Sequence, residues 1–201
     1  MIRVGLTGGL ACGKSYVGSL LAGMGCRVIR ADDLGHAVLA PGGEAFEPVV
    51  RHFGTGILGT DGTIDRRKLG AIVFRDAEQL ALLNSIVHPA VFRLEDEFAQ
   101  AAAAADPDAI VVVEAAILIE TGSHRRYDRL IVVVCSEAQQ IERAMHRDGS
   151  SREDVETRLR RQMPLHEKRK YADYVIDTSG SKEETAGQTR LVYEALRSKV
   201  I

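Results

Sequence analysis

The 201-residue sequence has no tryptophan, only three cysteines and no excess of basic residues. Cysteines this scattered (Cys12, Cys26 and Cys135) are too few for a disulfide framework or a zinc site, so we expect reduced thiols. Lys and Arg number 26 against 28 Asp and Glu, a balance that argues against a dedicated nucleic-acid-binding protein. No apolar run reaches the roughly 18 residues of a membrane span, and we expect no secretory signal. The absences predict a soluble, cytoplasmic protein with neither a membrane nor a nucleic-acid partner.

Strands and helices alternate along the chain. Two β-branched runs, at 110–113 and 130–134, lack apolar–polar alternation, which is typical of parallel strands covered on both faces. Further strands are expected at 2–7, 27–31 and, more weakly, 174–177. With helical patterns between them, these strands predict an α/β doubly wound fold with a five-stranded parallel sheet.

The stretch between the second and third strands is longer than a crossover helix needs. Residues 32–105 carry turn signals first and helical patterns afterwards, so we interpret them as a mostly helical insertion that covers a ligand. Within it, Pro89 is expected to break one helix and start the next. His88 fits either a ligand contact or this helix break, and the pattern alone favours the break.

A glycine-rich turn joins the first strand to the first helix. Residues 8–15, with the sequence GGLACGKS, match the phosphate-loop pattern G-x-x-x-x-G-K-[ST] at every fixed position. Such a loop points successive backbone N–H groups at phosphate oxygens, while its lysine reaches the β- and γ-phosphates and its serine binds Mg²⁺. The residues expected to bind the nucleotide are Gly8, Gly9, Ala11, Cys12, Gly13, Lys14, Ser15 and Tyr16, with Ser15 as the Mg²⁺ ligand.

Cys12 lies inside this loop and allows two interpretations. The helix N-terminus and Lys14 could lower the pKa of its thiol and make it reactive. The simpler interpretation is a small residue at a position where only the backbone matters.

A phosphate loop alone does not separate switch GTPases, motor ATPases and small-molecule kinases. The sequence has no Asn-Lys-x-Asp or Thr-Lys-x-Asp guanine-binding motif, and larger ATPases usually need a longer chain. A compact kinase fits better, although two alternatives stay open: a kinase of another small acceptor, such as a nucleoside monophosphate, and a non-catalytic nucleotide-binding switch.

Two aspartates follow the second strand, beside the phosphate loop in a doubly wound fold. A carboxylate there can accept a proton from an acceptor hydroxyl or orient it for attack on the γ-phosphate. Asp32 and Asp33 could equally cap the next helix, and position alone does not choose between these roles.

Charged residues later in the chain complete the candidate site. Glu114 follows the third strand, where an acid commonly helps to hold Mg²⁺. Arg143 and Arg147 are four residues apart on one predicted helix and would present two guanidinium groups to a transferring phosphoryl group. For most arginines of 136–170, a solvated helix face with ion pairs is the simpler interpretation.

Six short stretches occur in a fixed order: 4–9, 28–32, 61–69, 83–89, 142–147 and 171–176. This series resembles the bacterial dephospho-CoA kinase family over nearly the whole chain. The chain departs from the family pattern at Ala11, Tyr16 and Ala116, where the family usually has Gly, Thr and Pro.

The resemblance implies a three-layer phosphate-loop kinase that phosphorylates the 3′-hydroxyl of dephospho-CoA with ATP and Mg²⁺, the last step of coenzyme A synthesis. It implies a core of 1–31, 106–135 and 171–201, a dephospho-CoA-binding insertion of 32–105 and a lid of 136–170. The implied catalytic residues are Asp32, Lys14, Arg143 and Arg147, and the implied acceptor-binding residues are Thr7, Asp32, His36, His88 and Glu114. The sequence leaves the oligomeric state open.

Overall fold

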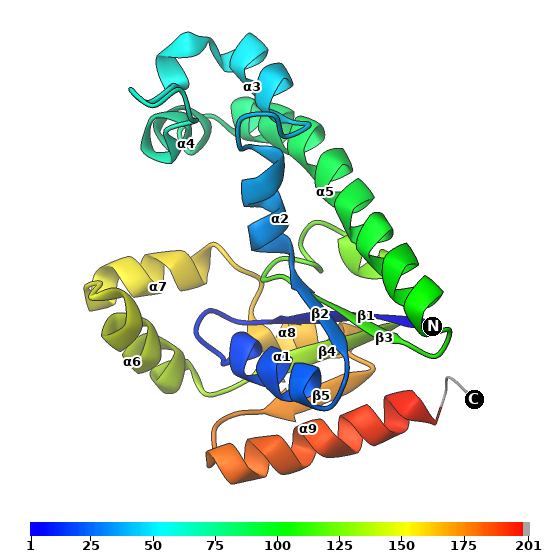
Figure 1. Cartoon of the computed structure of the whole chain (residues 1–201). Coiled ribbons are helices and arrows are strands. Elements are labelled where there is room, and N and C mark those ends of the chain that lie inside the picture. Colours follow the sequence, from blue (N-terminus) through cyan, green and yellow to red (C-terminus); the bar gives the residue numbers. More distant parts are fainter. Residues whose placement is uncertain (199–201) are drawn as a thin grey trace. The chain divides into compact units, whose positions relative to one another are not determined.

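The computed structural model describes residues 1–198, which divide into two compact units (Figure 1). The first consists of Met1–Ile29 and the chain from Ala101 onward, and the second of Arg30–Gln100. The second unit nearly coincides with the range 32–105 that the sequence marks as an insertion.

The first unit is built on a five-stranded sheet in the order β2-β3-β1-β4-β5, which confirms the predicted fold class. The strands are β1 (Ile2–Gly8), β2 (Arg27–Arg30), β3 (Ile110–Glu114), β4 (Arg129–Val134) and β5 (Tyr174–Asp177). β1 pairs in parallel with β3 and β4, and β4 pairs in parallel with β5. Every residue of β3 is buried, which explains its unbroken apolar run.

The strand register brings the carboxyl ends of four strands to one edge of the sheet. Leu6 lies opposite Glu114, Gly8 opposite Val133, and Val134 opposite Asp177. The segments that follow these positions therefore start side by side, and ligands of open α/β sheets bind at such an edge.

The helices of the first unit connect and cover these strands. They are α1 (Lys14–Gly23), α6 (Glu137–Asp148), α7 (Arg152–Arg160), α8 (Leu165–Lys168) and α9 (Lys182–Arg197), with the short 3₁₀ helices η2 (Ser123–Arg126) and η3 (Arg169–Tyr171). α1 and α9 pack against each other (Figure 1). A capping box starts α6: the Ser136 hydroxyl accepts a hydrogen bond from the Gln139 backbone N–H, and the Gln139 side chain accepts one from the Ser136 backbone N–H.

Helices make up the second unit. They are α2 (Ala31–Val38), α3 (Phe46–Phe53), the 3₁₀ helix η1 (Thr55–Ile57), α4 (Arg66–Val73) and most of α5 (Ala77–Ala105). A small core of Val49, Ile57, Leu69 and Val73 holds α3, η1 and α4 together. Asp65 caps α4 by accepting hydrogen bonds from the backbone N–H groups of Arg67 and Lys68.

The expectation that Pro89 divides two helices is wrong. α5 runs without interruption from Ala77 to Ala105 with Pro89 inside it. An interior proline removes one backbone hydrogen bond, but the residues next to it, Ala90 and Val91, are buried in a cluster with Val38 and Ala45. Tertiary packing therefore outweighs the local preference for a break.

Within residues 1–198, no helix is long and apolar enough to cross a membrane.

Candidate nucleotide-binding site

The phosphate loop connects β1 to α1 in an unusual backbone conformation. Gly13, the N-cap of α1, has φ 82°, and Ala11 has φ 53°, the only positive φ outside glycine in the described part of the chain. Left-handed residues near a helix N-terminus turn backbone N–H groups toward one point, where an anion binds. A Cβ on Gly8 would collide with the backbone oxygen of Val133, so this position requires glycine.

Ser15 and Glu114 form the polar centre of the site. The Ser15 hydroxyl donates a 2.7 Å hydrogen bond to Glu114 Oε1, and Glu114 is buried at the end of β3. A hydroxyl and a carboxylate are the oxygen ligands that Mg²⁺ prefers, so this pair fits the ion. In residues 1–198 no group of three or more His, Cys, Asp and Glu side chains could hold a metal ion.

Lys14 folds back over the loop. Its Nζ donates a 2.9 Å hydrogen bond to the carbonyl of Gly9, and the side chain is half-buried. This contact holds the ammonium group, and its positive charge, at the loop.

Side chains of α6 and the residue that follows β5 hold the phosphate loop in place by hydrogen bonds. The buried side chain of Gln140 donates to the carbonyl of Leu10 at 2.9 Å. The Thr178 hydroxyl donates to the carbonyl of Cys12 at 2.9 Å, and Arg143 donates to the Thr178 carbonyl at 2.8 Å and to its hydroxyl at 3.1 Å. Arg143 is thereby linked to the loop through Thr178.

A buried lysine joins the loop to two other segments. Lys168 is fully buried, and its Nζ lies 2.9 Å from Glu120 Oε1, 2.8 Å from the Ala116 carbonyl and 3.4 Å from the Gly8 carbonyl. Glu120 also accepts from the backbone N–H of Met163. The Thr7 hydroxyl donates to the same Ala116 carbonyl at 3.1 Å. One ammonium group therefore fixes the start of the phosphate loop and the turn after β3.

Arg147 and Tyr16 make separate contacts. Arg147 pairs with Asp148 at 2.7 Å, and Arg158 pairs with the same carboxylate, so the two guanidinium groups hold the pKa of Asp148 well below its usual range. The two arginines therefore have different partners: Arg143 contacts Thr178, and Arg147 pairs with Asp148. The Tyr16 hydroxyl donates to the Lys182 carbonyl at 3.4 Å, and Lys182 Nζ lies 5.9 Å from the ring centroid.

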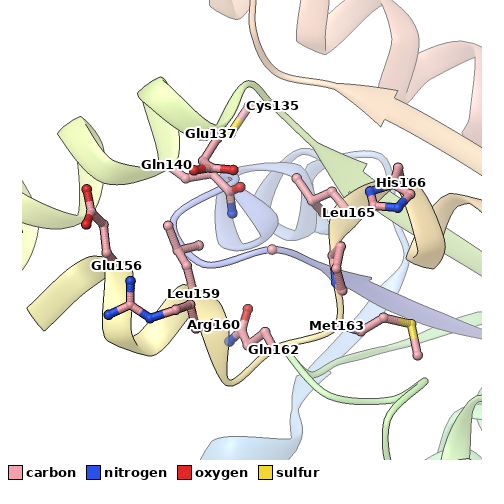
Figure 2. Close-up of a pocket in the computed structure, with 12 residues that line it drawn as sticks. Cys135, Glu137, Gln140, Glu156, Leu159, Arg160, Gln162, Met163, Leu165 and His166 are labelled. Atoms are coloured by element: carbon pink, nitrogen blue, oxygen red, sulfur yellow. The ribbon is translucent and has the colours of Figure 1, made fainter. Parts of the chain in front are cut away.

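A cavity of about 710 Å³ lies within the first unit, beside the phosphate loop (Figure 2). Gly9 lines it from the loop, Cys135 from the position after β4, Gln140 from α6, and Leu159 and Arg160 from α7. The remaining lining residues are Glu137, Glu156, Gln162, Met163, Pro164, Leu165 and His166. The predicted lid segment thus borders an open space next to the loop.

Comparison with known proteins decides the family. The family model described as dephospho-CoA kinase matches residues 2–184. The chain belongs to the dephospho-CoA kinase family. A dephospho-CoA kinase from Aquifex aeolicus is 45% identical over 196 residues, which cover 98% of each chain.

Solved structures agree with this assignment. A crystal structure from Thermus thermophilus superimposes with a TM-score of 0.86 at 34% identity and covers 96% of each chain. Dephospho-CoA kinase from Campylobacter jejuni gives a TM-score of 0.72 at 26% identity, over 99% of this chain and 98% of that one. As a dephospho-CoA kinase family member, the chain is an enzyme of the kinase class, for which ATP is the phosphoryl donor.

The remaining predicted residues belong to the second unit. Asp33 forms a bidentate ion pair with Arg30 at 2.7 and 2.8 Å, and this hydrogen bonding lowers the pKa of the Asp33 carboxyl. The side chain of Asp32 is exposed and makes no hydrogen bond or ion pair with any residue that the structure describes. The N-cap of α2 is Arg30, without a side-chain cap, so the capping interpretation of the two aspartates is wrong.

Two histidines complete this part of the prediction. His36 is exposed in the last turn of α2. His88 lies in α5 with its ring centroid 6.0 Å from that of Phe92, and burial lowers the pKa of its imidazole.

Sequence reasoning missed Lys168, Gln140 and Thr178 as supports of the loop. Lys168 belongs to the basic run Lys168-Arg169-Lys170, whose members are indistinguishable by pattern although only the first is buried. Gln140 and Thr178 carry no motif of their own. Glu120 is visible in the sequence only as an acid after an apolar stretch.

Proposed function

We propose that this chain transfers the γ-phosphoryl group of ATP to the 3′-hydroxyl of dephospho-CoA and so produces coenzyme A. The observation that carries the proposal is the family match over residues 2–184, together with an intact phosphate loop. The two alternatives raised by the sequence, another small acceptor and a non-catalytic switch, gain no support from relatives that are named for dephospho-CoA.

The phosphate loop and its neighbours bind the nucleotide. The backbone N–H groups of residues 8–16 surround the phosphates, and Lys14 adds a positive charge to the β- and γ-phosphates. Arg143, and Arg147 once it leaves Asp148, neutralise the charge that develops on the transferring group. Phosphoryl transfer needs little covalent help, so most of the catalysis comes from positioning and charge stabilisation.

Ser15 and Glu114 would hold Mg²⁺, with Ser15 as a direct ligand and Glu114 as the acid that orients it. When bound, the ion would supply positive charge that offsets the negative charge of the phosphates. The 2.7 Å contact between the two side chains supports this role, because the hydroxyl already faces the carboxylate.

Asp32 receives the proton of the acceptor hydroxyl or orients that hydroxyl for attack. The ion pair of Asp33 with Arg30 supports this choice, because it occupies the neighbouring carboxylate and leaves Asp32 available. We assign His36, His88, Thr7 and Glu114 to acceptor binding and residues 32–105 to the acceptor-binding domain, following the family resemblance. The lid of 136–170 and the location in the cytoplasm also stay predictions.

An acceptor panel tests the function. Purified protein is mixed with ATP and Mg²⁺, and ADP release is measured without acceptor and with dephospho-CoA, AMP or CMP. We expect release that depends on dephospho-CoA and exceeds release with either nucleotide. ADP release that depends on AMP or CMP and not on dephospho-CoA would contradict the proposal. Nucleotide binding without transfer to any acceptor would contradict it as well.

A further inference from the structure

Two of the three cysteines meet inside the site. The Sγ atoms of Cys12 and Cys135 lie 3.3 Å apart, within hydrogen-bonding distance. Cys12 belongs to the phosphate loop, and Cys135 directly follows β4 and precedes the N-cap of α6. They are 123 positions apart in the sequence, so the fold alone creates this pair.

The pair is buried but not sealed. Cys12 has no exposed surface and Cys135 is 8% exposed. Cys135 lines the cavity beside the phosphate loop (Figure 2), so a small oxidant that enters the cavity reaches this sulfur first. The Cys12 sulfur lies 3.3 Å from the Cys135 sulfur, and Cys12 is not among the residues that line the cavity.

The surroundings of the two thiols differ. The hydrogen bond with Cys12 lowers the pKa of Cys135, the Arg143 guanidinium and Thr178 lower it further, and burial and Asp177 oppose them. The same hydrogen bond and burial raise the pKa of Cys12. Because the thiolate is the nucleophile, Cys135 is the sulfur that reacts first and Cys12 is the thiol that follows.

We propose that Cys12 and Cys135 are a peroxide-sensitive modification site, at which a reversible disulfide forms and withdraws the phosphate loop from ATP binding. In the first step the Cys135 sulfur attacks one oxygen of hydrogen peroxide, the O–O bond breaks, and the second oxygen leaves as water after taking up the proton of the thiol. Cys135 is then a sulfenic acid. In the second step the Cys12 sulfur attacks the Cys135 sulfur and loses its proton to the departing hydroxide, which leaves as a second water. Two thiols are oxidised and one peroxide is reduced.

The bond changes the loop because of where Cys12 lies. A disulfide has an S–S distance of about 2.05 Å, so the two sulfurs must approach each other by about 1.2 Å. Cys12 stands between Ala11 and Gly13, the two left-handed residues that orient the N–H groups of the loop. Moving this residue also disturbs the 2.9 Å hydrogen bond from Thr178 to the Cys12 carbonyl. The effect on ATP rests on the proposed nucleotide-binding role of the loop.

The experiment uses the full chain with and without hydrogen peroxide at neutral pH. Intact-mass measurement, peptide mapping without reductant and ATP titration are made on each sample, before and after dithiothreitol. We expect a loss of two hydrogens, a linked peptide pair containing Cys12 and Cys135, and ATP affinity reduced at least about tenfold, the factor that corresponds to the loss of one hydrogen bond to a charged group. Dithiothreitol should restore the affinity.

Two variants serve as matched controls. Cys135→Ala removes the first sulfur and should keep its ATP affinity after peroxide treatment. Cys26→Ala removes a buried cysteine whose pKa burial raises to about 11, and it should respond to peroxide as the parent chain does. Absence of the Cys12–Cys135 link, or a link that leaves ATP affinity unchanged, would overturn the proposal. Neither result would contradict the proposed function, because ATP binding by the reduced chain is measured separately in the same experiment.

Discussion

The hydroxyl of Ser15 donates a 2.7 Å hydrogen bond to Glu114, which joins the first turn of α1 to the end of β3. These residues are 99 positions apart, and the parallel pairing of β1 with β3 brings them together. The contact combines a motif serine with an acid from another strand, and both side chains carry oxygen atoms of the kind that Mg²⁺ takes as ligands.

Removing the Glu114 carboxylate should weaken the binding of Mg²⁺. Because a group that orients a metal ligand typically contributes 10–100-fold in metal affinity, we expect Glu114→Gln to raise the Mg²⁺ concentration for half-maximal activity by about that factor. Ser19→Ala is the matched control, since Ser19 lies one turn further along α1 and bonds only to the Ser15 carbonyl. Equal Mg²⁺ titrations for Glu114→Gln and the parent chain would exclude a role of Glu114 at the ion.

The left-handed conformation of Ala11 carries a conformational cost that glycine would not have. An L-residue in this region is disfavoured by roughly 1–2 kcal/mol, and replacing it by glycine removes that cost. Glycine also gives the unfolded chain more conformational freedom, which lowers stability by about 0.4–1 kcal/mol. We therefore expect Ala11→Gly to leave the free energy of unfolding unchanged or raise it by up to about 1 kcal/mol.

Ala101→Gly provides the comparison, because Ala101 is exposed within α5, where glycine costs about 1 kcal/mol. Urea unfolding of both variants measures the difference. A similar loss of stability in the two variants would show that Ala11 is not strained.

Lys168 is fully buried and pairs with Glu120, whose side chain is 21% exposed, and the two should behave as one unit. Glu120→Gln leaves the buried ammonium group without its carboxylate and should destabilise the chain by up to about 3–5 kcal/mol, whereas Lys168→Met leaves a partly exposed carboxylate and should cost less. The double variant should lose clearly less than the sum of the two single losses. Denaturant unfolding of the three variants gives the coupling, and additive losses would mean that the pair is not energetically coupled.

The half-buried His88 predicts a pH dependence of stability. Its pKa in the folded chain is below the ordinary value of 6.5, so the unfolded chain binds the proton more readily. Stability should therefore fall as the pH drops below 6.5, and His88→Gln should lose less stability between pH 7 and pH 5 than the parent chain. Thermal unfolding at both pH values checks this, and equal losses would show that His88 is not the group responsible.

Local patterns in the sequence predicted much of the fold. The β-branched strands and the turn between the first strand and the first helix are encoded within a few residues, so their geometry follows from the segment itself. The division of α5 at Pro89 was a wrong prediction because burial of the neighbouring residues decides whether a helix continues.

The supports of the loop could not be predicted because they join distant segments. The contact from Gln140 to Leu10 spans 130 positions and that from Thr178 to Cys12 spans 166. No periodicity or motif marks such pairs, and only the order of the strands brings them to one edge of the sheet. For the same reason the sequence around Cys12 favoured a small residue of no chemical role, and it did not reveal that Cys135 lies beside it.

The most direct test of the account compares the products formed by the parent chain, Asp32→Asn and Asp33→Asn. Each protein is incubated with ATP, Mg²⁺ and dephospho-CoA, and the mass of the product and its rate of formation are measured together with ATP affinity. The account predicts a product heavier than dephospho-CoA by one phosphoryl group that co-elutes with coenzyme A. Asp32→Asn should form it about 10²–10⁴-fold more slowly while ATP affinity is kept, and Asp33→Asn should retain most of the rate. No such product from the parent chain, or a near-normal rate with Asp32→Asn, would contradict the account.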